Sequence, residues 1–259
     1  GNSLGPLPKS VKLKTQQVIE DQWGKMLITG WNKAGWMQQP IDLGNRIGRL
    51  IGAEHGHVVV GDTLSIKVYQ ALASALELRP DRKIILSDVG NFPSDIYIAE
   101  GLINSLGKGH KINLVPPDEL TKHLNEDVAV LMLTEVDYRT GRMHDMLSLN
   151  KLAQHVGAIT LWDLAHSAGA VDVNLMQSNT DFAVGCTYKY LNAGPGAPAF
   201  IYVAPHLVNT VSPALSGWLG HAVPFAFEPS YRSGPAIERM RIGTPAVIAS
   251  ASLDAALDI

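Results

Sequence analysis

Short apolar runs recur along the chain and alternate with stretches of helical periodicity. The runs expected to form strands cover residues 58–60, 83–87, 112–115, 128–134, 158–162, 182–185 and 199–203. Helices fit between several of them, at about 65–78, 93–106, 117–124 and 147–156. Strands that are apolar on both faces are typical of a parallel sheet covered by helices. The pattern predicts an α/β fold with a mainly parallel central sheet and flanking helices.

Composition excludes several classes of function. The 259 residues carry a formal net charge of -3, which gives no electrostatic basis for binding nucleic acid or an anionic membrane surface. No apolar run approaches the roughly 18 residues of a membrane span. Cys186 is the single cysteine, so an internal disulfide is impossible and a reducing, cytoplasmic location is expected.

One lysine has an unusual setting. Lys189 lies between the apolar run 182–185 and a turn that contains Gly194, Pro195 and Gly196. A lysine amine in poorly hydrated surroundings loses its proton more readily. A neutral amine attacks aldehydes, which is how a lysine holds pyridoxal phosphate (PLP) as a Schiff base. Considered alone, such a residue is more often a solvated loop charge.

An acidic residue upstream favours the cofactor interpretation. Asp163 follows the run 158–162, and His166 lies three positions further on. PLP chemistry needs an acid facing the pyridine nitrogen, because the protonated ring is the electron sink. The alternatives are a helix cap for Asp163 and a satisfied core histidine for His166. No metal site is predicted, since no cysteine or second histidine lies at ligand spacing, and no Gly-x-Ser-x-Gly elbow indicates a serine nucleophile.

Other candidates lie at strand ends, where α/β sheets bind ligands. Residues 61–65 enter a helix, a position suited to phosphate, although an ordinary helix cap is the alternative. Phe92 and Asp95 follow the run 83–87, where an aromatic ring can stack on a planar cofactor. A plain helix start at Pro93 explains that segment locally as well. Thr134 ends a further strand and could reach the same edge.

Five segments together carry a family resemblance: residues 1–6, 30–36, 91–95, 162–169 and 188–196. They resemble the class V, fold-type I PLP-dependent enzymes, and among these the kynureninase family. The resemblance extends over essentially the whole chain. Cysteine desulfurases share the Asp-x-x-His motif and the lysine, but they lack the pairing of Phe-Pro-Ser-Asp with Tyr-Lys-Tyr-Leu-Asn.

The resemblance implies a role for each matching residue. Lys189 would hold PLP and act as acid and base, with Tyr188 and Asp163 as further catalytic residues. The implied cofactor-binding positions are Leu64, Ser65, Phe92, Pro93, Ser94, Asp95, Thr134, Asp163, His166, Tyr188, Lys189, Trp218 and Thr244. Trp218 and Thr244 match positions that reach the phosphate from a neighbouring subunit. The resemblance therefore implies a homodimer with shared active sites.

The implied activity is hydrolysis of L-kynurenine or 3-hydroxy-L-kynurenine to anthranilate or 3-hydroxyanthranilate and L-alanine, a step of tryptophan catabolism. The substrate would be a small amino acid. Alternatives are another class V activity, such as an aminotransferase or cysteine desulfurase, and an inactive truncated fragment that only binds PLP.

The expected organisation follows from the same resemblance. Residues 1–45 form an N-terminal segment with a long helix at about 10–31, and residues 46–245 form the PLP-binding large domain, with long ordered loops at 212–241. Residues 246–259 begin a helix leading to a C-terminal small domain that is not present. The chain starts without methionine and ends inside that helix, which indicates a fragment. The family's arginine for the substrate carboxylate lies in the small domain and has no counterpart here.

Overall fold

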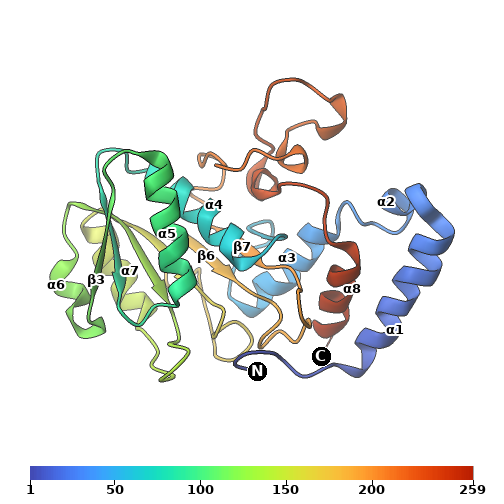
Figure 1. Cartoon of the computed structure of the whole chain (residues 1–259), viewed down its shortest axis with the longest axis horizontal. Helices are drawn as coiled ribbons and strands as arrows, with labels where there is room; N and C mark the ends of the chain where they lie inside the picture. The colour runs from blue at the N-terminus through green and yellow to red at the C-terminus, as the bar shows by residue number, and fades with distance from the viewer. Residues whose placement is uncertain (259) are drawn as a thin grey trace.

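A single seven-stranded sheet organises the computed structural model, which describes residues 1–258 (Figure 1). Its strands are β1 (Val58–Val60), β2 (Ile84–Asp88), β3 (Lys111–Val115), β4 (Val128–Thr134), β5 (Ile159–Asp163), β6 (Phe182–Gly185) and β7 (Phe200–Val203). They lie in the order β1-β7-β6-β5-β4-β2-β3. β7 runs antiparallel to both of its neighbours, and all other pairs are parallel. The predicted mainly parallel α/β sheet is confirmed.

Helices cover both faces of the sheet (Figure 1). On one face lie α4 (Leu64–Glu77) and α5 (Pro93–Leu106); on the other lie α3 (Gln39–Leu50), α7 (Met146–His155) and α8 (Val247–Ala256). The remaining helices are α1 (Lys9–Gln17), α2 (Gly30–Lys33) and α6 (Leu120–His123). Within the described residues, no helix combines the length and the apolar character needed to cross a membrane.

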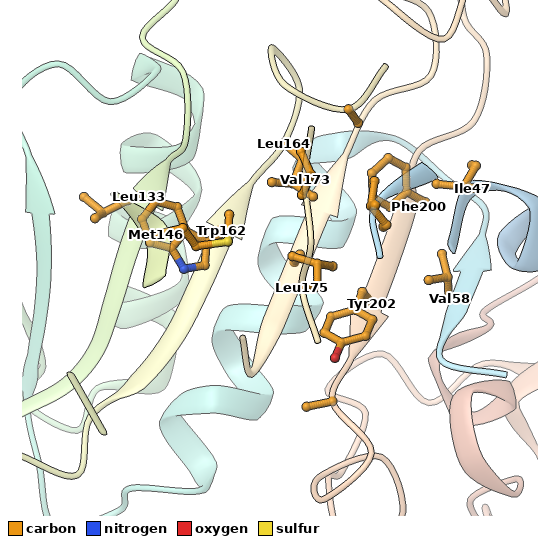
Figure 2. Packing of buried hydrophobic residues seen from close by; sticks show 14 of the residues in the cluster. Ile47, Val58, Leu133, Met146, Trp162, Leu164, Val173, Leu175, Phe200 and Tyr202 are labelled. Carbon is orange, nitrogen blue, oxygen red and sulfur yellow. The ribbon is translucent and has the colours of Figure 1, made fainter. Parts of the chain in front are cut away.

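Alternation along each strand divides the core into two clusters. In β4, Val130 and Met132 face α4 and α5, whereas Leu131 and Leu133 face the opposite side. Figure 2 shows the cluster that contains Leu133, in which the rings of Trp162, Phe200 and Tyr202 are among the largest side chains. Because both faces are covered, every residue of β4, β5, β6 and β7 is buried. This explains the uninterrupted apolar runs in the sequence.

The strand directions bring the candidate site residues together at one edge of the sheet. β1, β2, β4, β5 and β6 all point the same way, so the segments that leave them meet at their carboxyl ends. α5 begins with Pro93 in its first turn and ends at Leu106. Gly107 follows as its C-cap, with a φ of 61° in the left-handed region that glycine tolerates. Asp145 caps α7 by accepting a hydrogen bond from the Ser148 N–H at 3.0 Å.

The N-terminal region differs from the single helix expected at 10–31. α1 ends at Gln17 and continues as a π-helical segment η1 (Val18–Met26), a 3-10 turn η2 (Leu27–Thr29) and the short α2. Leu27 has a φ of 49°, which breaks the helix. The chain then folds back, so that Trp36 covers Gly30 and its indole N–H donates to Gln22 Oε1 at 2.8 Å. Tertiary contacts of Trp36 therefore override the local helical periodicity.

Two other helical stretches also differ from the sequence-based expectation. α3 was not predicted; Gly44 and Gly48 interrupt its apolar pattern, and Gly44 is required because a Cβ there would meet the Val58 backbone oxygen. The helix expected at 117–124 is a 3-10 turn η3 (Pro117–Glu119) followed by the one-turn α6. Residues 212–241 form loops as predicted, with the short 3-10 turns η4 (Trp218–Gly220), η5 (Pro224–Ala226) and η6 (Ala236–Met240).

Candidate active site

Lys189 lies in the turn after β6, and its side chain is only 7% exposed. The Nζ atom is 2.8 Å from His166 Nε2 and 5.6 Å from the ring centroids of both Phe92 and Tyr188. Burial, followed by the nearby lysine charge, lowers the pKa of His166 to about 4. The imidazole is therefore neutral near pH 7 and can accept a hydrogen bond from the lysine.

Asp95 and Asp163 form a buried carboxyl pair beside this lysine. Burial raises the pKa of Asp163 to about 6, and burial together with the charge of Asp163 raises the pKa of Asp95 well above its usual range. Asp163 also accepts a hydrogen bond from the Ala165 N–H at 2.8 Å. The raised pKa of both acids favours a proton within the pair, because two carboxyls close together in an apolar site resist ionising together.

An asparagine links two of the predicted residues. Asn91 Oδ1 accepts hydrogen bonds from the Thr134 hydroxyl at 2.6 Å and from the Phe92 N–H at 2.7 Å. Its amide nitrogen donates to Ser87 Oγ at 2.9 Å. Asn91 thus fixes the loop that carries the Phe92 ring, and Thr134 acts on this site through Asn91. Pro93 is exposed and Ser94 half-buried in the first turn of α5.

Tyr188 is half-buried and precedes the lysine directly. Burial, with a smaller effect of Cys186, raises the pKa of the Tyr188 phenol to about 12. The phenol therefore keeps its proton at neutral pH and serves as a donor. Burial likewise raises the pKa of the Cys186 thiol to about 11, so this cysteine carries no reactive thiolate.

Leu64 and Ser65 are the first two residues of α4, and the N-cap residue Thr63 makes no side-chain cap bond. Their backbone N–H groups are therefore available to an anion, as at other helix N-termini. Lys67, which is 1% exposed, stabilises the turn at Asp62 that precedes α4. Its Nζ donates to Asp62 Oδ2 at 3.0 Å, and Asp62 adopts a φ of 54°.

Trp218 and Thr244 lie in the long loops of the C-terminal region. Both line a cavity of about 250 Å³ next to the loop arm, residues 216–234, which projects from the body of the molecule (Figure 1). Trp218 is 43% exposed and packs against Phe225 and Phe227, at ring-centroid distances of 5.6 and 6.4 Å. Thr244 also lines a smaller cavity of about 130 Å³ with Gly61, Asp62 and Lys67, so it lies near the start of α4 in its own chain.

Sequence reasoning assigned no role to two residues that the structure places in the site. Asn91 stands directly before Phe92 at a strand end, a position that could have indicated its role. Asn2 reaches His166 from the other end of the chain, with Oδ1 at 2.8 Å from Nδ1. Only the segment 1–6, which contributed to the family resemblance, signalled its importance.

Asp88, Arg142 and His144 form a mostly buried ionic cluster at the carboxyl end of β2. Asp88 Oδ2 is 2.6 Å from His144 Nε2 and 3.1 Å from an Arg142 guanidinium nitrogen, and Asp88 Oδ1 accepts from the Gly90 N–H at 2.6 Å. The hydrogen bond and charge of His144 outweigh burial and lower the pKa of Asp88. This cluster was not predicted because its partners are 54 and 56 positions apart in sequence.

Comparison with known proteins places this geometry in context. Residues 45–259 match the model of the family described as aminotransferase class-V. A kynureninase of Pseudomonas fluorescens is 47% identical over 264 aligned residues, and one of Deinococcus radiodurans is 46% identical over the same length. Each alignment covers 100% of this chain and 64% of the relative. The chain therefore spans less than two thirds of the length of these curated relatives.

Solved structures share the fold at low sequence identity. The apo cysteine desulfurase of Thermococcus onnurineus superposes with a TM-score of 0.80 at 19% identity, covering 99% of this chain and 65% of that chain. A C-DES mutant with glycine covalently linked to its PLP cofactor gives a TM-score of 0.86 at 16% identity, covering 99% and 69%. The predicted fold-type I architecture is thus confirmed.

Proposed function

The chain belongs to the class-V aminotransferase family, and on this basis we propose that it binds pyridoxal 5'-phosphate and hydrolyses L-kynurenine or 3-hydroxy-L-kynurenine. The products are anthranilate or 3-hydroxyanthranilate and L-alanine, which makes the reaction a step of tryptophan catabolism. The names of relatives 45–47% identical over the chain support this substrate. The observation that carries the proposal is the buried Lys189 amine, set beside His166 and the Asp95–Asp163 carboxyl pair.

The residues fit the cofactor in three respects. Lys189 offers a buried amine whose polar partner, His166, is neutral at pH 7. The Asp95–Asp163 pair offers a proton and a negative charge together, which suits a pyridine nitrogen. The uncapped start of α4 offers N–H groups to a phosphate. When bound, PLP serves as an electron sink for the bonds at the substrate's α-carbon.

Each residue of the site then has a defined task. Lys189 would hold the cofactor and carry the substrate's α-proton as acid and base. Asp163 and Asp95 would face the pyridine nitrogen, where a carboxyl favours a protonated ring. Phe92 and His166 would contact the ring, and Leu64 and Ser65 would hold the phosphate.

Tyr188 is our candidate for proton transfer at the substrate's γ-carbonyl. Its high pKa keeps the phenol protonated, so it can donate as water adds to the carbonyl carbon. The Cβ–Cγ bond then breaks: the water oxygen stays on the γ-carbon as the anthranilate carboxylate, and the β-carbon gains a proton to become the alanine methyl group. Because Tyr188 and Lys189 are adjacent in the chain, one turn would hold both the phenol for the γ-carbonyl and the amine for the α-carbon.

We further propose that two copies form a homodimer with shared active sites. Trp218 and Thr244 would contact the phosphate of the neighbouring copy. The loop arm supports this proposal, because Phe225 is 61% and Phe227 74% exposed. Aromatic side chains exposed together typically mark an interaction surface. We also propose a cytoplasmic location, with which the single buried cysteine is compatible; cell fractionation tests it.

Product analysis tests the proposed reaction. Chain of verified intact mass, saturated with PLP, is incubated with kynurenine, and anthranilate is followed by its fluorescence. Lys189→Ala should abolish product and remove the visible absorbance of the lysine-bound cofactor. A 2-oxo acid formed from kynurenine without anthranilate, or release of sulfur from cysteine, would instead indicate another class V activity. Full PLP occupancy without turnover would identify a cofactor-binding fragment.

Complementation tests the shared site. Lys189→Ala and Trp218→Ala chains, each inactive alone, are mixed under conditions that exchange subunits. A hybrid dimer carries one site with both residues intact, so about a quarter of the unmodified activity should return by random pairing. Absence of recovery, with mixed dimers verified by mass, would show that Trp218 acts within its own chain.

A further inference from the structure

The first five residues form a short strap across the candidate site. The Gly5 N–H donates to the Tyr188 backbone oxygen at 2.8 Å, directly before Lys189. A Cβ at Gly5 would meet the Lys189 backbone oxygen, and one at Gly1 would come within 2.6 Å of the Tyr190 ring. The strap is therefore held closely at both ends. Asn2 lies between these contacts.

Asn2 joins three loops that leave different strands. Its amide nitrogen donates to the Tyr138 backbone oxygen at 3.2 Å, which turns Oδ1 toward His166. The Tyr190 hydroxyl also points to this oxygen, at 3.5 Å. Both contacts assign the same orientation to the amide, since the nitrogen faces a carbonyl and the oxygen faces a hydroxyl.

This orientation determines the protonation of the histidine ring. Asn2 Oδ1 can only accept, so His166 Nδ1, 2.8 Å away, must carry the hydrogen. Because the ring is neutral at pH 7, Nε2 then presents a lone pair. That lone pair faces Lys189 Nζ at 2.8 Å. The opposite tautomer would direct an N–H at Nζ, so a lysine ammonium there would meet a donor in place of an acceptor.

We propose that Asn2 is a positioning residue, which fixes His166 in its Nδ1–H tautomer and thereby aims the Nε2 lone pair at Lys189. The lysine amine is held at one point of the site, ready to meet the cofactor aldehyde. The catalytic meaning of this arrangement rests on the proposed role of Lys189. The tautomer itself does not, and it is open to measurement in the cofactor-free protein.

Nitrogen NMR tests the tautomer directly. The chain is labelled with ¹⁵N in its histidine rings, and the His166 signals are assigned by their loss in His166→Gln. We expect a protonated Nδ1 and an unprotonated Nε2 at pH 7. Asn2→Leu should shift both signals toward each other or exchange them, whereas Asn2→Asp, which still offers an acceptor to Nδ1–H, should keep the original tautomer.

Ser3→Ala is the matched control, because Ser3 is exposed and adjacent in the strap. It should leave the His166 signals unchanged. A second readout is the rate at which added PLP acquires the absorbance of its lysine-bound form, which Asn2→Leu should slow by about tenfold, the equivalent of one net hydrogen bond. An unchanged His166 tautomer in Asn2→Leu would overturn the proposal, whether or not the chain hydrolyses kynurenine.

Discussion

His166→Gln should change how the stability of the cofactor-free chain depends on pH. The folded-state pKa of His166 is about 4, whereas an unfolded histidine titrates near 6.5. As pH falls below about 6.5, the unfolded chain gains a proton at this site and the folded chain does not. Stability is therefore lost as pH falls through this window, until the folded form also protonates near pH 4.

The size of the effect follows from the two pKa values. Between pH 7 and pH 5 the unfolded form of His166 becomes almost fully protonated, while the folded form stays neutral. This difference in proton binding lowers the free energy of unfolding by about 2 kcal/mol as the pH falls from 7 to 5. Because His166 is only 5% exposed, solvent screening reduces this value little. His166→Gln lacks the titration, so it should gain about 2 kcal/mol relative to the unmodified chain over this range.

Urea titrations at pH 7, 6 and 5, followed by tryptophan fluorescence, measure the difference. Asp163 opposes His166: its raised pKa favours proton uptake by the folded state, so it adds about 1 kcal/mol of stability as pH falls from 7 to 5. The unmodified chain shows the sum of these effects, and only the variant-minus-parent difference isolates His166. His55→Gln, at an exposed histidine, is the control. If the free energies of unfolding of His166→Gln and the parent changed with pH in parallel, the reasoning that His166 is a buried neutral imidazole would be refuted.

Three further outcomes test the supporting structure. Lys67→Met removes the bonds from the lysine to Asp62, Gln70 and the Met240 backbone oxygen. It should lower the free energy of unfolding by about 2–4 kcal/mol and weaken PLP binding, measured by urea titration and by absorbance. Gly5→Ala should lower the free energy of unfolding by about 1–3 kcal/mol, because its Cβ would meet backbone atoms. Gly101→Ala, which has open space around it in α5, should raise the free energy of unfolding by up to about 1 kcal/mol. Equal effects of the two substitutions would contradict the close fit at Gly5. The Cys186 thiol, buried and with its pKa raised to about 11, should react with a disulfide reagent only at the rate of unfolding, and rapid labelling of the folded chain would exclude this.

The sheet was predictable because its strands are buried on both faces. Apolar runs such as β4 have no polar alternation, and tertiary contacts do not change that pattern. The N-terminal helix was not predictable to its end, because Trp36 reaches back over Gly30 from outside the periodic stretch. α3 was missed for a related reason: Gly44 allows close contact with β1, and its presence in the sequence weakens the helical signal.

The candidate site was predictable where its residues follow strands. Asp163, Phe92 and Lys189 each occupy a segment that leaves the carboxyl edge of the sheet, and topology alone brings such segments together. The partners Asn2 and Asn91 act through hydrogen bonds to residues 164 and 43 positions away, and no local pattern encodes these. Trp218 and Thr244 were assigned by resemblance only, because the loops that carry them show no periodic pattern.

The proton arrangement explains why the site is ready for a phosphorylated aldehyde. Burial raises the pKa of both Asp95 and Asp163, which limits the negative charge that this pair carries beside Lys189. His166 stays neutral because burial and the lysine both oppose its protonation. A second charge on either the carboxyl pair or the imidazole would leave buried charge uncompensated. The Asn2 contact extends this balance, because an imidazole held as a neutral acceptor stabilises the lysine without adding charge. If the site holds PLP as proposed, the carboxyl pair would face its pyridine nitrogen and Lys189 would meet its aldehyde, while the neutral imidazole would add no further charge.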